Sequence, residues 1–181
     1  MVQSISLNKL SFLKFFAIFA IGLLLFYGVY YSIFFQDIVK PLIVNFQTSI
    51  SGFLLQLFGF AVETNMDQLI GSNILVKVSG GCDGIEATAL YLIALFLFPI
   101  PIKYKWSGLL WGLLVLTILN ILRIIGLFLV AKYYPNNFEF MHTQGGLYLY
   151  SFITILLVLI WSDWALKNYQ KELKNSTNRS V

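Results

Sequence analysis

Four apolar segments, each long enough to cross a lipid bilayer, constrain the fold of this chain more than any other feature. They extend over about 10–35, 84–102, 106–131 and 145–166. A helix needs about 20 residues to span the ~30 Å hydrocarbon core of a membrane. Of the 181 residues, 59% are hydrophobic and 11% are charged, whereas a soluble domain carries roughly a quarter charged residues. The sequence therefore predicts one all-α integral membrane domain over 1–181 and excludes a soluble globular protein.

The region between the first two spans is expected to hold an amphipathic helix and a short strand. Over 41–62, polar or small residues recur every three or four positions, which is typical of a helix with one polar face. They are Asn45, Ser49, Gly52, Gln56 and Gly59, followed by Glu63. A fifth crossing there would invert every later loop, so we expect this helix to lie at the outer membrane face. After it, the alternation of Ile74, Val76 and Val78 predicts a strand over Asn73–Ser79.

The distribution of charge predicts how the bundle of about four transmembrane helices is oriented. Lysines cluster before the first span, after the second span and in the polar tail 167–181, whereas 36–83 carries more acidic than basic residues. Because positively charged loops stay in the cytoplasm, both termini are expected to be cytoplasmic, with 36–83 and 132–143 outside. The net charge of +4 is thus explained by membrane orientation and gives no reason to expect a nucleic-acid partner.

This topology brings three chemically distinctive side chains to the outer side of the membrane. Cys82, the single cysteine, precedes the second span, and His142, the single histidine, precedes the fourth. Arg123 lies in the third span, roughly 12 Å of helix below its outer end at 1.5 Å per residue. A charge there costs about 2.5–3.5 kcal/mol, so it is expected to face a partner such as Glu86, or a wet cavity. Asn120 lies on the same helix face as Arg123.

Cys82 and His142 have the chemistry of a nucleophile and its general base. A following helix N-terminus and Arg123 favour the thiolate, whereas Asp83 and Glu86 oppose it by repulsion. One cysteine and one histidine are too few for a zinc site, and no glycine motif fits a nucleotide cofactor, so neither is expected. Two non-enzymatic readings stay open: a membrane subunit with an Arg123–Glu86 pair, and a carrier or lipid-binding protein that holds an anionic head group through Arg123.

Three motifs in this order resemble those of a known family. They are Gly81-Cys82-Asp83-Gly84-Ile85-Glu86, Leu119-Asn120-Ile121-Leu122-Arg123-Ile124, and His142 at the head of the last span. Over about Asn73 to Ser151 the chain resembles the exosortase/archaeosortase family of membrane-embedded sorting enzymes. The resemblance implies a cysteine protease or transpeptidase that forms a thioester. Cys82 would then be the nucleophile, His142 the acid and base, Arg123 the group that holds the oxyanion, and Asn120 a supporting residue.

The resemblance also implies a substrate and a location. The substrates would be exported, membrane-anchored proteins with a short C-terminal motif, one transmembrane helix and a basic tail. They would be cut at the extracytoplasmic face of the cytoplasmic (inner) membrane of a prokaryote. Two features depart from the family pattern: Asp83 stands where many members have serine, and about four spans are expected where many members have about eight.

Overall fold

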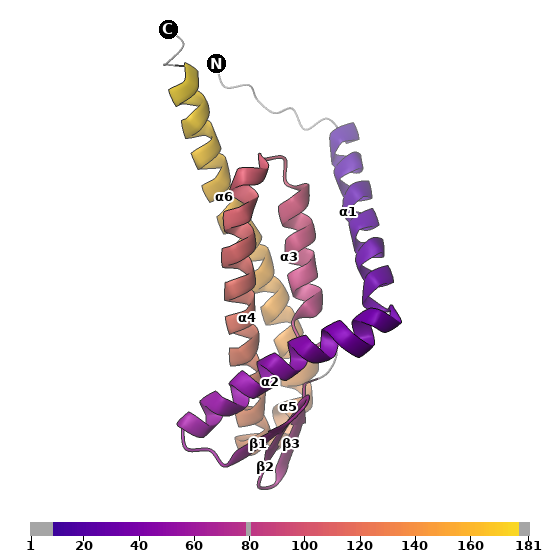
Figure 1. Ribbon diagram of the computed structural model, residues 1–181, viewed down its shortest axis with the longest axis vertical. Coiled ribbons are helices and arrows are strands. Elements are labelled where there is room, and N and C mark those ends of the chain that lie inside the picture. Colours follow the sequence, from indigo (N-terminus) through magenta and orange to yellow (C-terminus); the bar gives the residue numbers. More distant parts are fainter. Residues whose placement is uncertain (1–8, 79–80, 178–181) are drawn as a thin grey trace.

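The computed structural model describes residues 9–78 and 81–177, and most of them form helices (Figure 1). The remainder of the predicted domain 1–181 lies outside the described residues. That remainder includes Ser79 at the end of the predicted strand, Gly80 before the cysteine motif, and the last four residues of the predicted tail. The predicted all-α membrane fold is confirmed.

The helices and strands follow one another in a simple order. The α-helices of the described residues are α1 (Lys9–Tyr30), α2 (Lys40–Leu57), α3 (Ile85–Leu97), α4 (Ile102–Tyr133), α5 (Phe138–Phe140) and α6 (Gly146–Thr177). A π-helix, η1 (Phe35–Val39), precedes α2, a 3-10 turn, η2 (Pro135–Asn137), precedes α5, and a second π-helix, η3 (Met141–Gly145), precedes α6. The strands are β1 (Val62–Asn65), β2 (Gln68–Gly71) and β3 (Ile74–Lys77).

The long helices form an elongated bundle, and the sheet lies at one of its ends (Figure 1). Helices α1, α3, α4 and α6 run roughly parallel, and α2 crosses obliquely near the end where the sheet lies. The start of α1, the α3–α4 connection and the end of α6 all lie toward the opposite end. Pro99 and Pro101 lie in the short α3–α4 connection. They separate the two helices there, because proline disfavours helix both in a helix interior and at the preceding residue.

Length and hydropathy mark three helical stretches of the described chain as able to cross a membrane. They are Phe35–Leu57, Ile102–Tyr133 and Pro135–Ser176. Two further apolar helices are shorter, at Lys14–Tyr30 and Ile85–Leu97. The first of the three contains α2, whose oblique course fits the predicted helix at the membrane face better than a fifth parallel crossing (Figure 1). The placement of 41–62 at the membrane face stays a prediction.

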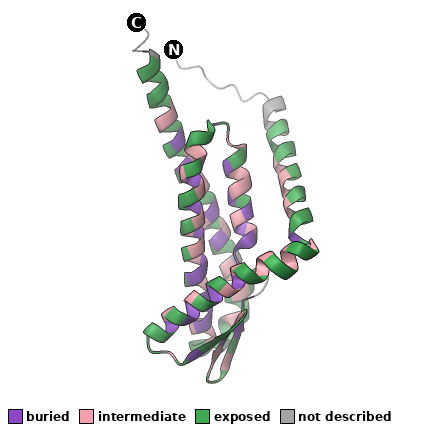
Figure 2. Cartoon of the chain, in the orientation of Figure 1, coloured by how far each residue is buried: buried purple, intermediate pink, exposed green. Residues whose placement is uncertain are grey.

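Helix α2 turns a partly polar face toward the rest of the protein (Figure 2). Its buried residues are Val44, Gln47, Thr48, Ser51, Gly52 and Leu55. Its exposed large side chains are Leu42, Phe46, Phe53 and Leu57. Of the polar face predicted over 41–62, Gly52 is buried whereas Ser49 and Gln56 are exposed. An apolar outer face is stable against lipid, and the inward polar side chains are available to the site beneath them.

The strands form an antiparallel sheet in the order β1-β2-β3, with Leu69 opposite Val76. These two residues and Val62 are buried in a core that also includes Ile124 and Phe128 of α4. The predicted strand is present as β3, with the expected alternation of buried and exposed residues. Strands β1 and β2 have no comparable alternation of buried and exposed residues. β1 buries only the first of its residues, and β2 only the second.

A second core lies within the bundle, where close packing of α3 on α4 depends on glycine. A Cβ atom at Gly112 of α4 would overlap the ring of Tyr91 on α3, whose hydroxyl donates to the Gly108 carbonyl at 2.8 Å. Overpacking of this kind costs about 1–3 kcal/mol. The Gly112→Ala variant should therefore lose about that much stability, measured as a lower thermal unfolding midpoint in detergent. Gly126→Ala, in open space on the same helix, is the matched control; equal midpoints for both variants would contradict this packing.

Candidate active site

Cys82, His142 and Arg123 come together at the end of the bundle nearest the sheet. The Cys82 Sγ lies 2.9 Å from Nδ1 and 4.0 Å from Nε2 of His142. The Arg123 Nη2 donates to the main-chain carbonyl of His142 at 3.4 Å. Three separate elements supply these residues: the loop before α3, the helix α4 and the π-helix η3. A thiol, an imidazole and a guanidinium thus form one cluster.

The loop that carries Cys82 depends on glycine at two positions. Gly81 and Gly84 have φ angles of 88° and 70°, a left-handed conformation that other residues rarely adopt. A Cβ atom at Gly84 would lie 2.9 Å from Cγ of Asn120 and 3.1 Å from the hydroxyl of Tyr150. Glycine therefore lets the cysteine loop turn sharply while it packs directly on α4 and α6.

Asn120 fixes this loop to α4. Its Nδ2 donates to the carbonyl of Cys82 at 3.0 Å and to Oε1 of Gln47 on α2 at 2.8 Å. Asn120 is 1% exposed, and a buried amide in an apolar helix is costly unless it is hydrogen-bonded. Asn120 accordingly joins the cysteine loop, α2 and α4, which suits the supporting position that the resemblance implies.

Asp83 is attached to the first turn of α3. Its Oδ1 accepts a hydrogen bond from the main-chain N–H of Ile85 at 3.1 Å, and its Oδ2 lies 3.9 Å from Nζ of Lys40. The expected placement of the α3 N-terminus beside the sulfur of Cys82 stays a prediction. The main-chain amide of Ile85 there is bonded to Asp83, and the positive charge that acts on Cys82 is that of Arg123.

Glu86 does not pair with Arg123, contrary to the expected structural pair. It is half-buried and interacts electrostatically with Tyr27 of α1. Within the described residues, neither Glu86 nor Arg123 forms an ion pair. Glu86 thus acts on a tyrosine of α1 although it is only one turn from the cysteine loop.

Burial decides the resting state of the thiol. It raises the pKa of Cys82 above the ordinary value, Arg123 acts in the opposite direction, and Asp83 raises the pKa further. A raised pKa means that the thiol keeps its proton at neutral pH. Burial likewise raises the pKa of Asp83, opposed by the Ile85 amide and by Lys40 and Arg123. The site therefore needs a base in direct contact with the thiol, the place that His142 occupies.

The guanidinium of Arg123 is held without a full set of partners. Its Nε is buried and has no hydrogen-bond partner among the described residues. Its Cζ lies 5.7 Å from the ring centroid of Tyr150, and a Cβ atom at Gly146 would approach its Nη2 to 2.5 Å. Phe138 stacks on the imidazole of His142 with the rings 12° from parallel. The Nε–H group of Arg123 thus makes no hydrogen bond within the described residues.

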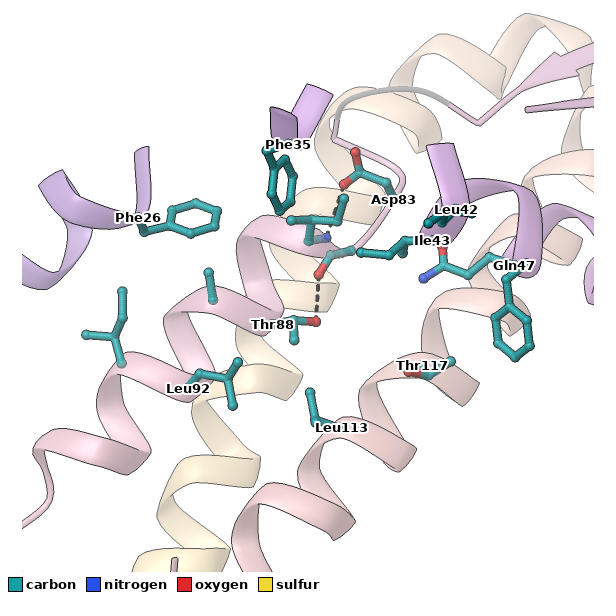
Figure 3. Close-up of a pocket in the computed structure, with 15 residues that line it drawn as sticks. Phe26, Phe35, Leu42, Ile43, Gln47, Asp83, Thr88, Leu92, Leu113 and Thr117 are labelled. Carbon is teal, nitrogen blue, oxygen red and sulfur yellow. Dashed lines mark hydrogen bonds between the residues drawn. The ribbon is translucent and has the colours of Figure 1, made fainter. Parts of the chain in front are cut away.

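Of two largely apolar cavities near the site, one reaches Arg123 of the cluster and the other reaches Asp83 of the cysteine loop. One, of about 360 Å³, lies between α4 and α6 and is lined in part by Arg123 and Gly146. The other, of about 620 Å³, lies among α1, α2, α3 and α4 (Figure 3). In Figure 3, Asp83 and Gln47 lie toward α2, and Leu92 is further down along α3. Over residues 9–78 and 81–177, no group of three His, Cys, Asp or Glu side chains is placed to hold a metal ion.

Comparison with known proteins identifies the family. The profile of the transmembrane exosortase family (Exosortase_EpsH) matches residues 12–159, a range that includes Cys82, Arg123 and His142. The chain belongs to this family. It is similar to the probable archaeosortase D of Methanocaldococcus jannaschii, with 37% identity over 98 residues. That alignment covers 54% of this chain and 62% of the relative, so it spans less than two thirds of the relative's length. No solved structure matches the chain.

Several residues of this candidate site were not found by sequence reasoning. Gln47, Lys40, Tyr150, Phe138 and Gly146 all contact the cluster or its neighbours. Gln47 offered the clearest signal, since a glutamine within an apolar helix needs an internal partner. The aromatic residues and the glycine gave none, because both types are frequent throughout the chain.

Removal of the Asn120 amide should destabilise the protein and free the cysteine loop. Asn120→Ala leaves the buried Gln47 side chain and the Cys82 carbonyl without their donor, which costs about 1–3 kcal/mol. We expect a lower thermal unfolding midpoint in detergent. Thr117→Ala, one turn earlier on α4, is the control, because the hydroxyl of Thr117 takes no part in the hydrogen bonds that join Asn120 to Gln47 and Cys82. An Asn120→Ala midpoint equal to that of the control would show that the amide does not hold the loop.

Proposed function

We propose that this exosortase family member is a cysteine-dependent membrane peptidase or transpeptidase that cleaves the C-terminal sorting signals of exported proteins. The observation that carries the proposal is the 2.9 Å contact between Cys82 Sγ and His142 Nδ1, with Arg123 beside it. The reading of Arg123 as half of a purely structural pair has lost its expected partner, because Glu86 and Arg123 form no ion pair in the described residues.

In the first step His142 acts as the general base. Its Nδ1 takes the proton of the Cys82 thiol, and the resulting thiolate attacks the carbonyl carbon of the scissile peptide bond. An imidazolium then lies beside a thiolate, and the positive charge of Arg123 stabilises the same sulfur. This proton transfer is required because burial raises the pKa of the thiol.

In the second step Arg123 stabilises the oxyanion that the attack creates. Its unpartnered Nε–H supplies a donor in a site that is shielded from water, where such a donor is most effective. When the intermediate collapses, the carbon–nitrogen bond breaks and His142 returns the proton to the leaving amine. The product is a thioester between Cys82 and the substrate, and an incoming hydroxyl or amine then releases the acyl group and restores the thiol.

The proposed substrates are membrane-anchored proteins that carry a short C-terminal motif, one transmembrane helix and a basic tail. The cluster lies at one end of the bundle, opposite the end of α6 and the start of α4 (Figure 1), where Lys103 and Lys105 lie. Positively charged ends favour the cytoplasm. We therefore propose that the site acts at the extracytoplasmic face of a prokaryotic cytoplasmic membrane, where an exported chain would meet it.

Loss of the thiol or its base should abolish or strongly slow processing. The assay co-expresses the chain with reporters fused to C-terminal motif–helix–tail segments of exported proteins from the same organism, and processing is followed as a mass change. We expect processing by the wild type, none by Cys82→Ala, and a rate about 10²–10⁴-fold lower for His142→Ala.

Thr143→Ala is the matched control, because Thr143 is the next residue on η3 and its exposed hydroxyl bonds only the carbonyl of Glu139. It should process reporters at the wild-type rate. Processing by Cys82→Ala at the wild-type rate would refute a thiol mechanism, and full activity of His142→Ala would remove His142 as the base.

A further inference from the structure

A buried carboxylate directly follows the proposed nucleophile and is only partly satisfied. Asp83 is 1% exposed, and its Oδ2 has no hydrogen-bond partner among the described residues. The one cation that forms an ion pair with it in the described region is Lys40, with Nζ 3.9 Å from Oδ2. A buried charge without a partner is strongly unfavourable, so this contact has a clear electrostatic purpose.

Lys40 is held in place by its own surroundings. It is the first residue of α2, and its Nζ lies 3.4 Å from the hydroxyl of Tyr30 and 3.4 Å from Oε1 of Gln36. The ammonium group also lies 5.4 Å from the ring centroid of Tyr30. The junction of α1, η1 and α2 thus directs one positive charge at the cysteine loop.

The charges around Cys82 explain why such a cation is needed. The sulfur faces Arg123 of α4, His142 of η3 and, from its own loop, Asp83. Asp83 in turn faces Lys40 of α2, Arg123 of α4 and Tyr150 of α6. A thiolate beside an uncompensated carboxylate is repelled, and weak screening in a buried site makes that repulsion larger than in water.

We propose that Lys40 is a positioning residue of this site: by pairing with Asp83 it cancels the negative charge next to Cys82 while leaving the carboxylate bound to the first turn of α3. The inference rests on the proposed function, because it concerns formation of the attacking thiolate. A neutral hydroxyl could accept the Ile85 N–H without a compensating cation, whereas aspartate requires one.

The single cysteine makes the test direct. Protein labelled with [3-¹³C]cysteine gives one signal, and its chemical shift followed against pH reports the ionisation of Cys82 without substrate or reagent. Removal of the cation in Lys40→Met should raise the midpoint by about 0.5–1 pH unit, because the Asp83 carboxylate is then left uncompensated and a like charge nearby disfavours the thiolate. Removal of the carboxylate in Asp83→Asn should lower the midpoint.

The double variant and the controls separate a charge effect from a change in fold. Lys40→Met combined with Asp83→Asn should restore a midpoint near the wild-type value, and Lys40→Arg should keep it. Lys167→Met removes an equal charge from the exposed pair of Lys167 with Asp163 on α6 and should change nothing. An unchanged midpoint in Lys40→Met, or a double variant shifted as far as Lys40→Met alone, would overturn the proposal.

The two proposals fail in different ways. If Lys40→Met shifts the midpoint but the wild type processes no reporter, the pairing stands and the sorting function falls. If Lys40→Met processes reporters with an unshifted midpoint, the function stands and the pairing falls. Should Lys40→Met not fold, the Asp83→Asn variant still decides, because a midpoint that does not fall would contradict a negative charge acting on Cys82.

Discussion

The side-chain amide of Asn120 is the interaction on which the cysteine site depends. It lies within an apolar helix, where a polar group without a partner is costly, and it meets that requirement by bonding both the cysteine loop and α2. Arg123 follows one turn later on the same helix and reaches the carbonyl of His142. Helix α4 thus aligns three separate segments, and the membrane setting makes the arrangement specific because few alternative polar partners exist there.

Burial gives this site both its precision and its chemical difficulty. A dry site strengthens the action of Arg123 on a developing oxyanion, but it also raises the pKa of the thiol. The contact with His142 addresses that difficulty, and the same principle applies to Asp83, whose charge is met by Lys40 at the start of α2. Helix α2 therefore contributes to the site through Lys40 at its start and Gln47 about two turns later, although it carries none of the family's motif residues.

The sequence predicts the fold class well, because a helix needs about 20 mostly apolar residues to cross a bilayer and such segments are easily recognised. It also identifies Cys82, Arg123 and His142, since each is chemically unusual at its position, and the structure brings them together; their roles stay predictions. The sequence does not reveal what depends on side-chain direction. The rotation of each helix about its axis decides which residues of α2 turn inward and that Glu86 acts on Tyr27 rather than on Arg123. The local turn before α3 decides that Asp83 bonds the Ile85 amide. The two additional strands were missed because they lack the alternation of β3: β1 buries only its first residue and β2 only its second.

The central claim is that Cys82 forms a covalent acyl-enzyme, and intact mass measures it most directly. Purified wild type and Cys82→Ala would be incubated with a membrane substrate that ends in a motif, an apolar helix and a basic tail, and then quenched with acid. The account predicts a wild-type species heavier by the mass of the intact substrate minus the mass of the released C-terminal segment, and no such species in Cys82→Ala. Tail release by wild type with no adduct at any time, together with equal release by Cys82→Ala, would contradict it.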